Sequence, residues 1–151
     1  MKKTLCVLTV AAIAAAALWA ADEITVTTYL KVDNGTFEYT KNVNQLRRDQ
    51  ANLGSSMNVQ SIQTNAAELL VVAADVTPYG YGFFRNVTTN TDRVIDIGPT
   101  DTNFTPVIRL EAGDVALLRL HPTEPLYAQA VRTSGTQTVA GVNLEHWILE
   151  D

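Results

Sequence analysis

Apolar and polar residues alternate from Ile24 onward, and the repeat is two residues rather than the 3.6 of a helix. In the stretch Ile24 to Val32 every second residue is apolar or threonine, while the residues between them are polar or aromatic. This alternation is typical of a strand that is buried on one face. Asn34-Gly35 follows, a dipeptide that readily adopts the positive φ angles of a tight turn, and the chain returns through Phe37 and Tyr39. The pattern therefore predicts a β-hairpin.

The rest of the chain consists of short apolar runs separated by turn residues. A polar segment, Asn42 to Ser56, comes first; we expect a loop with irregular strand there, and a short helix over Gln45 to Leu53 is the alternative. The strands predicted beyond it are Met57 to Gln63, Leu69 to Ala74, Tyr81 to Val87, Val94 to Ile97, Pro106 to Leu110, Val115 to Leu120, Leu126 to Val131 and Val142 to Leu149. Short strands divided by Gly, Pro, Asn and Asp predict an all-β fold, a single antiparallel β-sandwich.

The N-terminal segment Met1 to Ala21 has the features of a signal peptide. Lys2 and Lys3 supply a charged start, and the stretch Leu5 to Leu18 is apolar and rich in alanine. The stretch is short for a membrane span, so we expect cleavage near its end. The alternative is an uncleaved apolar helix that anchors the chain or packs inside an assembly, and membrane contact would then involve this helix alone. Residues 22–151 are expected to form the β-sandwich domain.

Composition narrows the class of partner. The chain has 151 residues, 46% of them hydrophobic and 18% charged, which is typical of one globular domain. After the leader, nine Lys and Arg stand against 16 Asp and Glu, a net charge of −7. Because such a surface repels phosphate, we expect no nucleic-acid partner. The single cysteine, Cys6, lies in the leader, so no disulfide is expected in the domain.

Residues that carry chemistry are few. His146 shares a face with apolar neighbours and is interpreted as a core or interface histidine, and His121 opens a His-Pro turn. Two histidines in separate elements are a weak metal pattern, so no metal ligand, catalytic residue or cofactor is expected. Calcium held by Asp96, Asp101, Asn103 and Asp114 is kept as an alternative, although these residue types are also common turn formers. A hydrolase assembled around a serine or a histidine is the other chemical alternative.

Aromatic residues gather in one predicted strand. Tyr79, Tyr81, Phe83 and Phe84 lie together, and with Trp147 they are expected to form much of the core. The alternative is an exposed strip on which sugar rings stack. The last predicted strand, Val142 to Leu149, is apolar on both faces, which predicts cover on both sides. One face would pack on the core, and a loop, the segment Asn42 to Ser56 or a neighbouring subunit would cover the other.

A series of sequence pieces, taken in order, resembles a known family. The pieces are Ile24-Thr25-Val26-Thr27-Thr28, Asn34-Gly35, Gly82-Phe83-Phe84-Arg85-Asn86, Val94-Ile95-Asp96-Ile97-Gly98, Phe104-Thr105-Pro106, Leu110-Glu111-Ala112-Gly113, Leu117-Leu118-Arg119-Leu120 and Leu144-Glu145-His146-Trp147-Ile148-Leu149-Glu150-Asp151. Together they resemble small β-sandwich proteins of tailed phages and prophages, virion structural or capsid-decorating components.

This resemblance covers nearly all of the domain from Ile24 and implies a jelly-roll-type module. It also implies a structural protein of the virion that binds itself and a capsid or tail protein. The leader favours an alternative: a secreted or periplasmic bacterial domain of the envelope or a filament, with carbohydrate as a further possible ligand.

Overall fold

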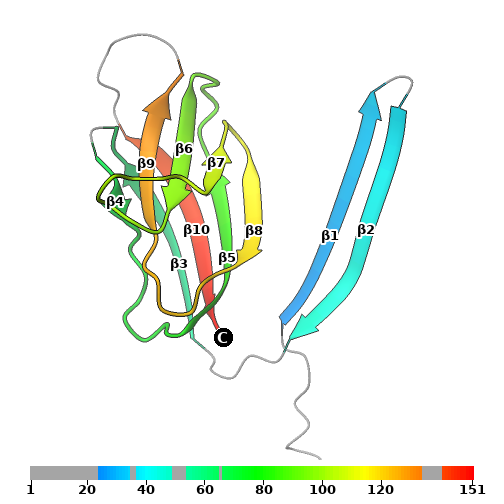
Figure 1. The fold of residues 1–151 in the computed structure, drawn as a ribbon, viewed down its shortest axis with the longest axis horizontal. Helices are drawn as coiled ribbons and strands as arrows, with labels where there is room; N and C mark the ends of the chain where they lie inside the picture. The colour runs from blue at the N-terminus through cyan, green and yellow to red at the C-terminus, as the bar shows by residue number, and fades with distance from the viewer. Residues whose placement is uncertain (1–23, 35–36, 49–53, 65, 134–140) are drawn as a thin grey trace, which may run out of the picture. The chain divides into compact units, whose positions relative to one another are not determined.

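The structure is a computed structural model that describes residues 24–34, 37–48, 54–64, 66–133 and 141–151. By their contacts, these residues fall into two units, one within Met1–Gln50 and one within Ala51–Asp151. All regular elements among them are antiparallel β-strands (Figure 1), which confirms the all-β prediction. The predicted apolar helix over residues 1–21 lies outside the described residues.

The first unit is a β-hairpin made of β1 (Ile24–Asn34) and β2 (Phe37–Arg48). Asn34 pairs with Phe37, so the chain turns where the sequence predicts. The expected half-buried strand is wrong over Thr27 to Lys31, where every side chain is exposed. The reason is that the two strands form a single layer, so the hairpin itself supplies no second layer to cover either face.

The second unit is sandwich-like, with two four-stranded antiparallel sheets. Its strands are β3 (Ser55–Ile62), β4 (Glu68–Leu69), β5 (Tyr79–Asn86), β6 (Arg93–Gly98), β7 (Ile108–Leu110), β8 (Val115–Arg119), β9 (Tyr127–Arg132) and β10 (Val142–Glu150). One sheet has the order β3-β10-β5-β8 and the other the order β4-β9-β6-β7 (Figure 1). The last strand of the chain therefore lies in the interior of its sheet, between β3 and β5.

The core lies between the two sheets and draws on both. Its buried residues are Ile62, Leu70, Val76, Phe84, Ile95, Ile97, Leu110, Leu120, Ala128, Ala130, Val142, Leu144 and Ile148. Strand β10 supplies the last three because every second residue of a strand points to the same face. Close packing also explains a glycine: a Cβ on Gly82 would lie 2.6 Å from the Phe84 ring.

Two segments differ from the sequence-based prediction. Strand β2 continues to Arg48, so the loop or helix expected from Asn42 is wrong up to that residue; residues 49–53 lie outside the described part. The covered strand expected over Leu69 to Ala74 is also wrong. Only Glu68–Leu69 forms strand, and the side chains of Leu69 and Val71 are exposed.

Side chains of β3 explain the second difference. Gln60 donates its Nε2–H to the Leu69 carbonyl at 3.1 Å and accepts the Val71 backbone N–H at 2.9 Å. The Ser56 hydroxyl accepts the Ala73 backbone N–H at 3.0 Å. These side chains provide the hydrogen bonds that a neighbouring strand would otherwise supply, so the segment needs no strand partner.

Candidate interaction surface

The aromatic residues of β5 divide between the two faces of its sheet. Phe84 is fully buried in the core, and Tyr79 packs against the core from its margin. Phe83 is half-buried and, because side chains alternate along a strand, points to the outer face together with Tyr81. Tyr81 is nevertheless only 6% exposed, and the Arg119 guanidinium of β8 lies 5.6 Å from the centre of its ring.

Trp147 lies on the outer face of the β3-β10-β5-β8 sheet and is 45% exposed. The prediction that its ring belongs to the core is therefore wrong. His146, its neighbour, is fully buried on the inner face, as the sequence predicts. The alternation of β10 decides the matter, because Val142, Leu144 and Ile148 take the inner positions and leave Trp147 outside.

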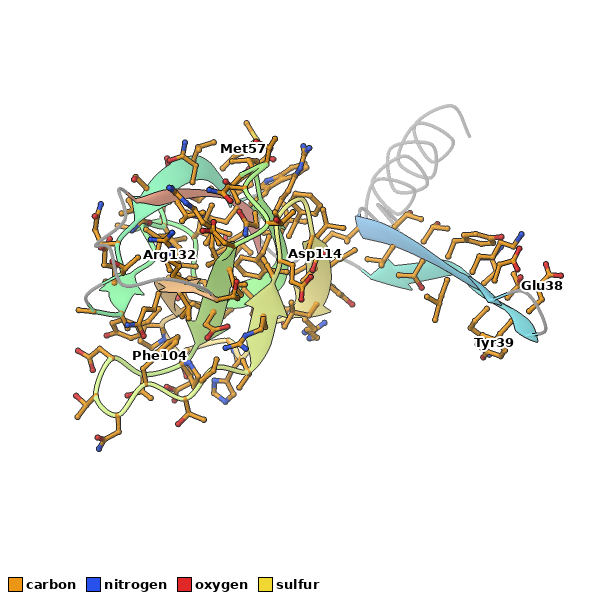
Figure 2. The ribbon with its side chains drawn as sticks, turned by 90° about the horizontal axis from the view of Figure 1, so that it is seen from above. Glu38, Tyr39, Met57, Phe104, Asp114 and Arg132 are labelled. Atoms are coloured by element: carbon orange, nitrogen blue, oxygen red, sulfur yellow. The ribbon has the colours of Figure 1, made fainter. Side chains whose placement is uncertain are left out.

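Cross-strand pairing joins Trp147 to apolar residues of the other three strands. Met57 of β3 pairs with Trp147, Trp147 with Phe83 of β5, and Phe83 with Leu117 of β8. Met57 is 74% exposed and Leu117 45%. These four residues, called the outer row below, cross the sheet from edge to edge. Figure 2 shows the Met57 side chain projecting from the sandwich.

The neighbouring row combines apolar ends with a charged centre. It runs Val59, Glu145, Arg85, Val115 across the same four strands. Val59 and Val115 are exposed. Arg85 and Glu145 form an ion pair with 3.7 Å between Nη1 and Oε2, and both side chains are partly open to solvent. The outer face thus carries a contiguous apolar strip beside the Arg85–Glu145 pair, and a second ion pair, Arg119 with Asp151, lies at the far end of β8. Apolar side chains with charges at their margin are the composition of an interaction surface.

His146 lies buried beneath this surface, where its charged form is disfavoured. Burial lowers the pKa of its imidazole below the ordinary 6.5, and a hydrogen bond to the Val71 carbonyl acts in the opposite direction but is the weaker influence. Nε2 lies 3.0 Å from that carbonyl oxygen, so Nε2 carries the proton and donates it. Nδ1 is buried and has no hydrogen-bond partner among the described residues. The arrangement is that of a packed core histidine.

Asn86, at the end of β5, was not recognised from the sequence as a structural residue. Its fully buried amide donates to the Arg93 carbonyl at 3.2 Å and to the Leu110 carbonyl at 3.1 Å. Its Oδ1 accepts the Thr88 backbone N–H at 3.1 Å. One side chain thereby ties β5 to strands of the other sheet. The bond to Thr88 is local, whereas the two carbonyls that receive the amide belong to strands that the sequence does not place beside β5.

The oxygen ligands considered for calcium are engaged elsewhere or exposed. Both carboxylate oxygens of Asp96 accept hydrogen bonds from Arg109 at 2.8 Å. Asp114 accepts the backbone N–H of Glu111, and Asp101 accepts the hydroxyl of Thr102. His121 is exposed, with Thr123 as its neighbour. Within the described ranges, no group of three or more His, Cys, Asp and Glu is arranged to hold a metal ion.

The part of the chain that the structure describes has no helix long and apolar enough to cross a membrane. The chain was also compared with known proteins. No family model, curated protein or solved structure matches it. The case for a function therefore rests on the residues of the chain and on the surface described above.

Proposed function

We propose that this chain is a non-enzymatic structural protein that assembles with itself or with a virion surface, as a capsid decoration or a tail component of a phage. The observation that carries the proposal is the outer row. Four large apolar side chains that cross a sheet face in one line lose contact with water only when another surface covers them. An assembling protein needs such a surface.

The strand order supports the same proposal. In the sheets β3-β10-β5-β8 and β4-β9-β6-β7, consecutive strands other than β6 and β7 lie in opposite sheets, an arrangement that supports a jelly-roll type of sandwich. Jelly rolls recur among viral capsid proteins. The pieces of sequence that resemble phage virion proteins include the β5 stretch Gly82 to Asn86 and the β10 stretch Leu144 to Asp151, which adjoin in the sheet.

Detection of the chain in particles tests the proposal. Phage particles released from a culture of the bacterium that carries the gene are banded on a density gradient and probed with an antibody against the chain. We expect the chain to band with capsids or tails, and the purified chain to self-associate in sedimentation. A chain that is absent from every particle fraction and monomeric at all concentrations would show that the proposal is wrong.

A second function, an exported carbohydrate-binding domain, is favoured by one observation. Trp147 and Phe83 are cross-strand partners on an exposed face, and aromatic rings in such a position offer a platform on which a sugar ring can stack. A glycan array tests it, with Trp147→Ala as the matched variant. Binding lost in that variant supports the second function, and no binding to any glycan excludes it. Recovery of the chain from the periplasm rather than from particles would also favour it.

A further inference from the structure

We propose that the outer face of the β3-β10-β5-β8 sheet is covered by the same face of a second copy of this chain, in a two-fold dimer. The inference rests on the proposed function, since it names the partner that the assembling surface meets. It starts from the register of the four strands, which fixes which outer residues lie opposite one another when two such faces meet.

Consider a two-fold axis that runs parallel to the strands, in the plane between the two copies, and passes midway between β10 and β5. Rotation about it places β10 of one copy over β5 of the other, and β3 over β8. Rows remain opposite the same rows, because the rotation leaves positions along the strands unchanged. This arrangement is isologous, so each contact occurs twice.

The outer row is complementary to itself under this rotation. Trp147 of one copy meets Phe83 of the other, and Met57 meets Leu117. Each pair brings two apolar side chains together, as in the interdigitated faces of two packed sheets. In the next row, Val59 meets Val115, and both are exposed in the single chain.

Charge decides in favour of a second copy as the occupant. The same rotation places Glu145 of one copy over Arg85 of the other, and Arg85 over Glu145, so both charges of this row meet their opposites. Sheets packed face to face lie about 10 Å apart, a gap that an arginine and a glutamate reaching toward each other can span. The ion pair of this row therefore becomes a network of four alternating charges.

The interface is modest, since it is four strands wide and strands lie about 4.8 Å apart. We therefore expect a dimer that dissociates on dilution rather than a permanent one. Sedimentation velocity of the full chain from about 1 to about 200 μM, a range suited to such an interface, should show a monomer–dimer equilibrium.

Two charge reversals, Arg85→Glu and Glu145→Arg, supply the decisive test. Either change alone places like charges opposite each other twice, and dimerisation should weaken at least about 30-fold. In an equimolar mixture of the two variants, each introduced charge meets the opposite introduced charge, and the unchanged Glu145 of one variant meets the unchanged Arg85 of the other. The mixture should therefore form a heterodimer, and the double variant should likewise recover its own dimer. A folding defect cannot produce this recovery, because a variant that fails to fold alone would also fail to fold in the mixture.

Met57→Glu should abolish the dimer as well, whereas Val107→Glu is the matched control. Val107 is 67% exposed, close to the 74% of Met57, but lies outside the proposed face, just before β7. We expect the Val107 variant to associate like the unmodified chain.

The results separate this inference from the proposed function. Association that both reversals leave unchanged would mean that the dimer uses another surface, such as a sheet edge; the inference is then wrong and the assembling function stands. The same holds for a strict monomer that is nevertheless found in particles. A strict monomer in which Met57 resists peroxide oxidation would mean that another part of the chain covers the face, which also overturns the inference. A strict monomer absent from all particles overturns both.

Discussion

Trp147 and Phe83 lie directly opposite each other on β10 and β5, on the face of the sheet that points away from the core. Immediately beside them, His146 and Phe84 form the equivalent pair on the inner face, and both are fully buried. Two adjacent cross-strand pairs thus place their large side chains in opposite environments. This contrast makes matched substitutions informative.

Truncation of one inner and one outer aromatic residue should separate stability from assembly. Phe84→Ala should lower the free energy of unfolding by about 3–5 kcal/mol, because it opens a cavity in the core. Trp147→Ala should lower it by less than about 1.5 kcal/mol, since nearly half of the side chain already contacts water. Urea denaturation of the monomer at low concentration measures both. Equal losses for the two variants would contradict the outward position of Trp147.

The pH dependence of stability should reveal the buried histidine. The native state lowers the pKa of His146 by burial, so below pH 6.5 the unfolded chain takes up a proton that the native chain excludes. The free energy of unfolding should therefore be steady above that pH and fall as the pH drops through the window between the ordinary and the lowered pKa. Urea denaturation at about pH 7.5 and at about pH 5.5 measures the fall.

Variants identify the group responsible for that fall. His146→Gln removes the titrating ring, so its stability should change less between the two pH values, although its stability at the higher pH is expected to be lower. His121→Gln is the matched control, because His121 is exposed. A slope that persists in His146→Gln and disappears in His121→Gln would contradict the assignment.

Asn86→Ala should destabilise the sandwich although it removes no apolar contact from the core. The change leaves the carbonyls of Arg93 and Leu110 without their donor, at about 1–3 kcal/mol for each buried group that stays unsatisfied. Asn143→Ala, at an exposed position of β10, is the control and should change stability by about 0.5 kcal/mol or less. Thermal unfolding compares the two. Similar melting temperatures would mean that water replaces the lost amide.

Much of the secondary structure could be predicted from short apolar runs and the turn residues between them. The predicted strands around Val94, Val115 and Leu126 agree with β6, β8 and β9 to within a few residues, because each has an apolar run bounded by turn residues. The prediction for the segment Leu69 to Ala74 was wrong although it rested on the same kind of pattern. Its apolar run is as strong as theirs, but its hydrogen bonds go to the side chains of Ser56 and Gln60, which no local pattern announces.

The outer row was beyond the reach of sequence patterns because it depends on which strands become neighbours. Alternation along β10 does place Trp147 and His146 on opposite faces of the sheet. The prediction of a core position for Trp147 followed instead from the general rule that large aromatic residues fill the core. Met57 and Leu117 are 60 residues apart in sequence, and they belong to the outer row only because of the register of β3 and β8 in the sheet. The sheet face on which a side chain lies can be predicted from the local sequence, whereas its partners on the neighbouring strands cannot.

Deletion of Leu144 to Asp151 should abolish soluble folding. These residues form most of β10, which pairs with β3 on one side and with β5 on the other, so their removal leaves both neighbours with unpaired backbone groups. The soluble fraction after expression and the amide dispersion of an NMR spectrum measure the result. A truncated chain that stays soluble with the melting transition of the full chain would show that β10 is dispensable.

The position of β10 also sets an order of events during synthesis. β3 is made early in the sandwich and β10 last, and within its sheet β3 pairs with β10 alone. A nascent chain therefore carries β3 and β5 with open edges until β10 itself has left the ribosome, and the sandwich closes only then. Throughout that interval the cell holds a chain with exposed strand edges, whose chief hazard is pairing with another unfinished copy.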